Sequence, residues 1–164
     1  MLAVSNTSPI SNLAIIGHLD LLKRQFGALW IPGAVAGELA VHPDPVALAA
    51  IRKAIRDQWI KETAVPQHST LLSVLLSSLH KGEAEAIVLA SDLKADIVII
   101  DEQEGRQLAT QAGLSVTGVL GVLLRAKRDG HIPAVKPEIQ ALRHKAHFFI
   151  SPFLEAKVLS SAGE

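Results

Sequence analysis

A run of four β-branched residues, Ile-Val-Ile-Ile at positions 97–100, constrains the fold of this 164-residue chain more than any other feature. β-branched side chains favour strands, and a strand with no polar alternation is buried on both faces, as in parallel sheets. Shorter runs at residues 2–5, 29–31 and 114–116 predict further strands, and Trp59–Thr63 is a candidate strand at an edge of the sheet. The segments between them have helical patterns. This alternation predicts an α/β fold, a three-layer α/β/α sandwich with a central, mostly parallel sheet of about four or five strands.

Helix boundaries are marked by capping residues and by glycine. Ser8 and Pro9 suit the N-cap and first turn of a helix, and Gly17, Gly27 and Gly113 follow expected helix ends. No repeat or linker divides the chain, so we expect one domain over residues 1–164, with the helices from about 135 a candidate oligomer contact. The helices are expected at residues 9–16, 18–26, 32–39, 45–56, 71–79, 83–93, 104–112, 118–128, 137–145 and 151–160.

Composition excludes several classes of protein. Apolar residues make up 49% of the chain and charged residues 20%, which is typical of a globular protein with a real core. There is no cysteine, so a disulfide framework, a thiolate metal site and a thiol nucleophile are all excluded. The first residues lack the basic start of a secretion signal, and every apolar stretch is shorter than the ~20 residues that span a membrane. We therefore expect a cytoplasmic protein with no membrane partner.

Polar and acidic residues follow several of the predicted strands. In a parallel sheet, the carboxyl ends of the strands share one edge, and functional residues gather there. Oxygen-bearing side chains would reach that edge from four distant parts of the chain, and such ligands suit Mg²⁺ or Mn²⁺. A metal held this way can activate water and stabilise the in-line displacement of a phosphodiester. The candidates are Asn6, Glu38, Glu83, Glu85, Asp101 and Glu102.

Five short motifs give the chain a family resemblance. They are Val4-Ser-Asn-Thr-Ser-Pro-Ile10, Ile31-Pro-x-x-Val-x-x-Glu38, Gly82-Glu-Ala-Glu-Ala-Ile87, Ile100-Asp-Glu and Thr117-Gly-Val-Leu-Gly121. In this order and spacing, over roughly residues 2–135, the chain resembles PIN-domain proteins, most of all a prokaryotic branch related to ribonuclease toxins of type II toxin–antitoxin pairs. The resemblance implies an α/β/α sandwich and Mg- or Mn-dependent cleavage of RNA. It also implies a homodimer and, in the toxin branches, a small antitoxin-like protein partner.

The resemblance assigns roles to individual residues. The second acid of the family falls on Glu38, and the third on Glu83 or Glu85, which differ by about 200° around a helix and cannot both face one metal. Glu83 is preferred, because Ala86, Ile87 and Ala90 at +3, +4 and +7 then stay in the core. The fourth acid falls on Asp101, with Glu102 as the alternative. Glu38, Glu83 and Asp101 are thus the expected catalytic residues.

The first position departs from the family. Asn6 stands where PIN domains usually have aspartate. An amide oxygen can still ligate a metal, so Asn6 is kept as a neutral fourth ligand, but one negative charge is lost and asparagine cannot act as a base. The alternative function is therefore a catalytically weakened PIN-like module that binds RNA or a protein. A phosphoacceptor receiver domain is set aside, because it needs a carboxylate after the first strand.

Basic residues toward the C-terminus are candidates for binding RNA phosphates. The expected nucleic-acid-binding residues are Ser8, Arg125, Lys127 and Arg128, with a second basic stretch at residues 143–147. The simpler interpretation is that these are solvated helix faces. In the same way, Asn6 and Ser8 are suited to capping a helix, and first-turn glutamates favour the helix dipole by only ~0.3–1 kcal/mol each. Phe148, Phe149 and Phe153 fit either the core or a dimer contact.

Overall fold

The computed structural model describes all 164 residues and contains one sheet of five parallel strands. β1 lies at the centre, hydrogen-bonded to β2 on one side and to β4 on the other, and β3 and β5 form the edges in the order β3-β2-β1-β4-β5. The bounds are β1 Ala3–Ser5, β2 Leu29–Pro32, β3 Ile60–Thr63, β4 Ile97–Ile99 and β5 Val116–Thr117. The predicted parallel sheet is confirmed, and residues 59–63 do lie at an edge.

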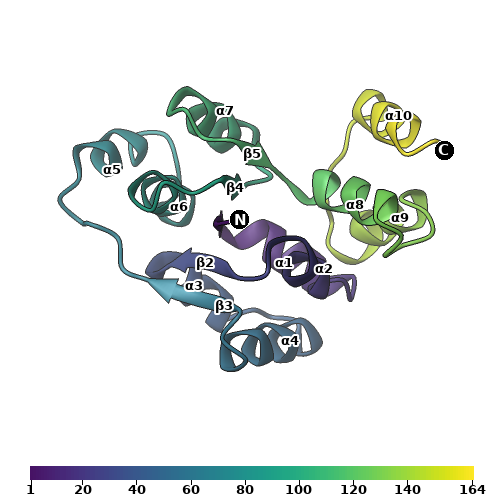
Figure 1. Ribbon diagram of the computed structural model, residues 1–164, viewed down its shortest axis with the longest axis horizontal. Coiled ribbons are helices and arrows are strands. Elements are labelled where there is room, and N and C mark those ends of the chain that lie inside the picture. The colour runs from purple at the N-terminus through teal and green to yellow at the C-terminus, as the bar shows by residue number, and fades with distance from the viewer.

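Helices connect the strands and cover the sheet (Figure 1). They are α1 Thr7–Ile15, α2 Asp20–Phe26, α3 Gly33–Ala40, α4 Pro45–Arg56, α5 Thr70–Leu75, α6 Lys81–Asp92, α7 Gln103–Gln111, α8 Val119–Arg128, α9 Lys136–Lys145 and α10 Pro152–Ser161. None of them is long and apolar enough to cross a membrane.

Two hydrophobic cores form on opposite faces of the sheet. Successive residues of a strand point to opposite faces, so Ala3 and Ile99 enter one core while Val4 and Val98 enter the other. The larger core is filled by residues of α1, α2, α3, α4, α8, α9 and α10, and the smaller one by residues of α5, α6 and α7. Both faces of the sheet are therefore buried, which is why its strands read as continuous apolar runs.

The strand order creates a crevice beside β1. β2 and β3 follow β1 on one side of the sheet. The chain then crosses over through α5 and α6, and β4 pairs with the other side of β1. The loops that leave β1 and β4 therefore diverge at the carboxyl edge of the sheet, and ligands of open α/β sheets bind at such a switch point. Asn6 leaves β1 there, and residues 101–102 follow β4 there.

Most helix boundaries lie within two residues of the prediction, and α1 begins at Thr7 with Asn6 as its N-cap instead of Ser8. Two differences stand out. α5 ends at Leu75 instead of Leu79, and the Ser77 hydroxyl donates to the Val74 carbonyl at 2.6 Å. Such local serine bonds compete with a continuing helix. α6 begins at Lys81, two residues before the predicted start, so Glu83 occupies its third position rather than its first. The second difference matters for the site, since a carboxylate at that position can turn back to the helix start.

Candidate metal-binding and catalytic pocket

Asn6 joins two elements of the crevice. Its side chain is 2% exposed and caps α1, with Oδ1 accepting from the Ser8 backbone N–H at 2.9 Å. Its Nδ2 donates to Oε2 of Glu102 at 3.0 Å. Asn6 thus follows β1, caps the start of α1 and is hydrogen-bonded to a residue that follows β4.

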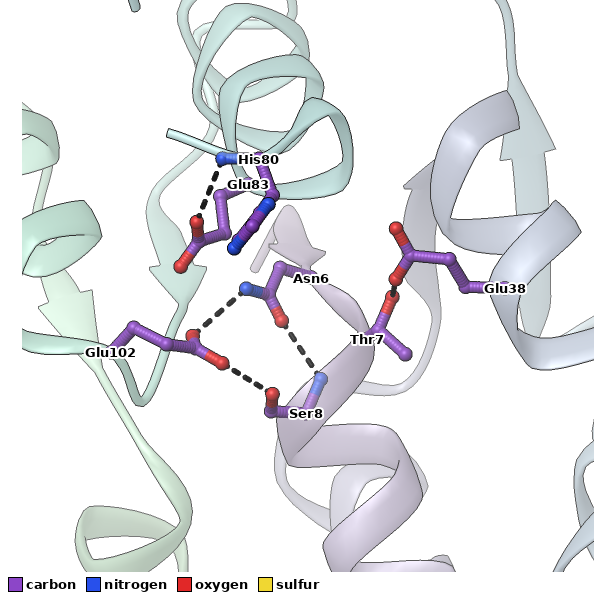
Figure 2. A pocket seen from close by; sticks show the side chains of 7 residues that line it. All are labelled: Asn6, Thr7, Ser8, Glu38, His80, Glu83 and Glu102. Carbon is purple, nitrogen blue, oxygen red and sulfur yellow. Dashed lines mark hydrogen bonds between the residues drawn. The ribbon is translucent and has the colours of Figure 1, made fainter. Parts of the chain in front are cut away.

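Glu102 stands at the N-cap position of α7. Its Oε1 accepts from the Ser8 hydroxyl, while its Oε2 accepts from Asn6 (Figure 2). Both donors come from the start of α1, so Glu102 is turned toward β1 and away from its own helix. These bonds fix one carboxylate at the centre of the crevice.

Glu38 reaches the crevice from α3. Its carboxylate accepts a hydrogen bond from the Thr7 hydroxyl, on the side of Asn6 away from Glu102 (Figure 2). Gly82 of α6 leaves space for this carboxylate, because a Cβ atom at position 82 would lie 2.8 Å from Oε1 of Glu38 and would displace it. Glycine in the Gly82–Ile87 motif therefore makes room for the second acid.

Glu83 is the third carboxylate, contributed by α6. It is 8% exposed, and Oε2 accepts from the His80 backbone N–H at 3.2 Å. Burial, and next the negative charge of Glu102, raise the pKa of the Glu83 carboxyl above its usual range. Two acids from separate helices thus repel each other here, which a bound cation would relieve.

Together these side chains line one polar cavity of about 230 Å³, with no hydrophobic residue in its wall. The lining residues are Asn6, Thr7, Ser8, Glu38, His80, Glu83 and Glu102, which we call the acidic pocket. All the carboxylates are turned toward hydrogen-bond donors of the protein. No three His, Asp or Glu side chains stand close enough together to form a ready-made metal site. The pocket therefore offers suitable oxygen ligands, but not a closed ligand cage.

Asp101 does not line the acidic pocket, in contrast to its expected place beside Glu38 and Glu83. It points the other way, and Oδ1 accepts from the Val119 N–H at the start of α8, at 2.7 Å. The two acids after β4 are bonded to different elements, Asp101 to the start of α8 and Glu102 to the start of α1. Glu102, the alternative in the sequence analysis, is the one that lies there. Burial raises the pKa of the Asp101 carboxyl to about 6.

Glu85 also lies outside the acidic pocket, as the helical phase of α6 predicted. It is 3% exposed and its carboxylate accepts from the Ala34 N–H at 3.0 Å and from Nε2 of Gln67 at 3.3 Å. Ala34 belongs to the first turn of α3, whose N-cap residue, Pro32, supplies no side-chain bond. Glu85 therefore supports the helix that carries Glu38, instead of facing the pocket itself.

The three basic residues expected to bind RNA lie on α8, and none of them lines the acidic pocket. Lys127 pairs with Glu164 at 3.1 Å and donates to the Ala162 carbonyl at 2.6 Å. Arg125 and Arg128 both pair with Asp129, at 3.5 and 3.2 Å. All three charges are thus already engaged within the chain. Ser8, the fourth expected residue, does lie in the pocket.

Thr7 and His80 line the pocket although the sequence analysis gave them no role. Thr7 neighbours Asn6, and a hydroxyl beside a candidate ligand is a signal that could have been used. His80 stands at the N-cap of α6, three residues before Glu83. That spacing places a cap residue beside the third residue of the helix, so a site at Glu83 implies His80 as its neighbour.

Comparisons with known proteins agree with this fold. The model of a family described as PIN domain matches residues 2–164, beyond the range that the motifs cover. Among solved structures, the chain is similar to a PilT N-terminus domain protein from the hyperthermophilic archaeon Sulfolobus solfataricus P2, with a TM-score of 0.55 and 19% identity. That likeness covers 77% of this chain and 93% of the archaeal one, and it concerns the fold alone. No curated protein matches the sequence.

Proposed function

Because the chain belongs to the PIN-domain family, which is generally a nuclease fold, we propose that it is a metal-dependent endoribonuclease. Glu38, Glu83 and Glu102 would hold Mg²⁺ or Mn²⁺ in the acidic pocket, and Asn6 would be a neutral fourth ligand. Glu102 replaces Asp101 in this assignment because of where the two side chains lie.

One observation carries the proposal: three carboxylates from separate helices line a single pocket at the switch point of the sheet. α3, α6 and the start of α7 are far apart in the sequence, and a fold gains nothing in stability from bringing their negative charges together. A cation is the simplest partner for such a group, and carboxylate and amide oxygens are the ligands that Mg²⁺ and Mn²⁺ prefer.

A divalent ion bound there supplies a Lewis acid for a phosphodiester and lowers the pKa of bound water. The residues of the chain position its ligands. Asn6 and Ser8 hold Glu102, and Thr7 holds Glu38. Burial and the charge of Glu102 raise the pKa of Glu83, and a cation that offsets the charge of Glu102 would lower it again.

The second candidate function is a PIN-like module that binds RNA or a protein but cuts poorly. Asn6 favours it, because the amide already uses both of its polar atoms on Ser8 and Glu102. In a ligand role, Asn6 would contribute the second lone pair of Oδ1 and no negative charge. The two functions differ in whether metal-dependent cleavage is present at all.

Finer expectations concern partners. A toxin-like role would come with a small antitoxin-like inhibitor, whose reading frame would neighbour that of this protein. Self-association as a homodimer has a candidate surface near the C-terminus, where Phe149 is 86% exposed and Phe153 is 82% exposed. The mass of the purified chain in solution measures this directly.

The proposal is tested by incubating the purified chain with a labelled single-stranded RNA, with Mn²⁺, with Mg²⁺ and with EDTA. Cleavage should require metal and should be lost in Glu83→Gln. Cleavage that survives in EDTA, or that Glu83→Gln leaves intact, would contradict it. Binding without any cleavage would favour the second function.

A further inference from the structure

The imidazole of His80 is the one polar side chain of the acidic pocket that makes no hydrogen bond. The other polar side chains of its lining are all hydrogen-bonded within the pocket. The His80 ring makes no cap bond at the start of α6 and takes part in no ion pair; only its backbone N–H is engaged, by Glu83. A ring nitrogen of His80 is therefore available to a ligand in the pocket.

His80 and Glu83 approach the pocket together from the start of α6. His80 is the N-cap residue and Glu83 the third residue of this helix, and residues three apart on a helix are neighbours. Figure 2 shows the imidazole ring beside the Glu83 carboxylate, directed toward Asn6. His80 is exposed and belongs to neither hydrophobic core, so packing does not account for the position of its ring. The ring faces the same cavity as the acids of the proposed metal site.

Imidazole nitrogen and carboxylate oxygen favour different divalent ions. Mg²⁺ prefers oxygen ligands and gains little from a nitrogen. Imidazole suits the later transition metals, and the affinity of mixed nitrogen and oxygen sites rises from Mn²⁺ through Fe²⁺ and Co²⁺ to Ni²⁺. A site that adds one imidazole to carboxylates therefore gains affinity for Co²⁺ without a matching gain for Mg²⁺.

The neutral side chain at position 6 makes the ligand type more important. An aspartate there would attract every divalent ion about equally, because all of them carry the same charge. Asn6 adds no charge, so the difference in affinity between two ions depends more on the atoms that bind them. His80 supplies the one nitrogen lone pair among the side chains that line the acidic pocket.

We propose that His80 is a nitrogen ligand of the metal ion in the acidic pocket, and that the pocket for this reason selects transition-metal ions over Mg²⁺. His80 and Glu83 then form a pair of ligands from a single turn at the start of α6. The presence of a metal ion rests on the proposed function, whereas the selectivity is a consequence of this one side chain.

Metal binding is measured without RNA, by titration calorimetry with Co²⁺ alone and with Mg²⁺ alone. The unmodified chain should bind Co²⁺ more tightly than Mg²⁺. His80→Ser should weaken Co²⁺ binding about tenfold or more and leave the affinity for Mg²⁺ unchanged. Serine is a preferred N-cap residue, so this variant should keep the start of α6. Glu83→Gln, which removes a carboxylate, should weaken the binding of both ions.

A matched control removes a different exposed histidine. His131 follows α8 and does not line the acidic pocket. His131→Ser should bind both ions as the unmodified chain does, which separates the pocket from Co²⁺ bound by histidines elsewhere on the surface.

The proton NMR spectrum of the Co²⁺-loaded chain gives a second readout that needs no variant. A histidine bound to Co²⁺ through one ring nitrogen shows the N–H of the other nitrogen as an exchangeable signal, shifted far outside the ordinary range. One such signal is expected in the unmodified chain and in His131→Ser. It should be absent from His80→Ser.

Equal affinity for Co²⁺ in His80→Ser and the unmodified chain would overturn the proposal, as would a Co²⁺ form without the shifted signal or an unmodified chain that prefers Mg²⁺. The result is separable from the proposed function. If His80→Ser loses the preference for Co²⁺ but no ion supports RNA cleavage, the ligand assignment stands and the nuclease proposal fails. If cleavage requires metal and His80→Ser keeps the ion preference of the unmodified chain, the ligand assignment fails alone.

Discussion

The side-chain amide of Asn6 donates to the Glu102 carboxylate across 3.0 Å while its oxygen caps α1 through the Ser8 N–H. An amide can donate and accept at once, whereas an ionised carboxylate can only accept. Asparagine therefore allows the loops after β1 and β4 to be tied together without a cation. With aspartate at this position, two carboxylates would face each other across the same gap.

Asn6→Asp should lower the thermal stability of the metal-free chain and make that stability depend on Mn²⁺. The new carboxylate keeps the cap but loses the bond to Glu102, and like charges at this distance repel. A cation that binds only the folded state then restores stability by mass action.

If the chain is a weakened nuclease, Asn6→Asp should also raise the rate of RNA cleavage, and a tenfold gain corresponds to ~1.4 kcal/mol of transition-state stabilisation. Melting curves and cleavage rates with and without Mn²⁺ check both; unchanged metal affinity and cleavage would favour the binding-module function.

Glu83→Gln and Glu85→Gln should separate the two acids of α6. Glu83 lines the acidic pocket, so the first variant should lose metal-dependent cleavage by at least about 100-fold, as when a key ligand or electrostatic group is removed. Glu85 faces Ala34 and Gln67, and a glutamine oxygen can still accept from the Ala34 N–H. The second variant should therefore keep most of its activity and lose little stability. Initial cleavage rates of the two variants test this prediction. A larger loss in Glu85→Gln than in Glu83→Gln would refute the placement of the two side chains.

Glu102→Gln and Asp101→Asn should differ in the same way for Mn²⁺ affinity. Only Glu102 lines the acidic pocket, while Asp101 is bonded to the start of α8. In titration calorimetry, the affinity for Mn²⁺ should fall about tenfold or more in Glu102→Gln and should change little in Asp101→Asn. A larger loss for Asp101→Asn would return the fourth acid to the position first expected from the sequence.

Asp101 should also make stability fall between about pH 4 and pH 6. Burial raises the pKa of its carboxyl from 3.8 to about 6 in the folded chain. The folded chain therefore binds this proton more tightly than the unfolded chain does. The contribution of this group to stability is complete below the unfolded pKa and is lost as pH rises through the folded one. One oxygen, Oδ2, is buried without a hydrogen-bond partner, which adds to the cost of ionisation.

Asp101→Asn removes this titration, because its oxygen can still accept from Val119 but cannot ionise. Relative to the unmodified chain, the variant should gain roughly 2 kcal/mol in the free energy of unfolding between pH 4 and pH 7, measured by urea unfolding in EDTA. Asp92→Asn, an exposed change at the end of α6, is the control and should show no such trend. Parallel pH curves for all three proteins would contradict the prediction.

Much of the fold followed from local sequence. The four β-branched residues at 97–100 could only be buried on both faces, and the capping residues and glycines fixed where most helices begin and end. The helical phase of α6 separated Glu83 from Glu85, because residues two apart on a helix diverge by about 200°. These features depend on neighbours along the chain, so a single sequence carries them.

The sequence alone determined the parallel α/β fold and the four parts of the chain that supply the acidic edge. Only the tertiary structure decided which acid after β4 enters the pocket. Asp101 and Glu102 are adjacent and chemically alike, and the choice depends on the Val119 N–H of α8 and on the donors Asn6 and Ser8. It likewise placed Arg125, Lys127 and Arg128 in ion pairs, and left the His80 imidazole unpaired in the acidic pocket. Such contacts join residues up to about a hundred positions apart, and no local pattern encodes which partner lies opposite a given side chain.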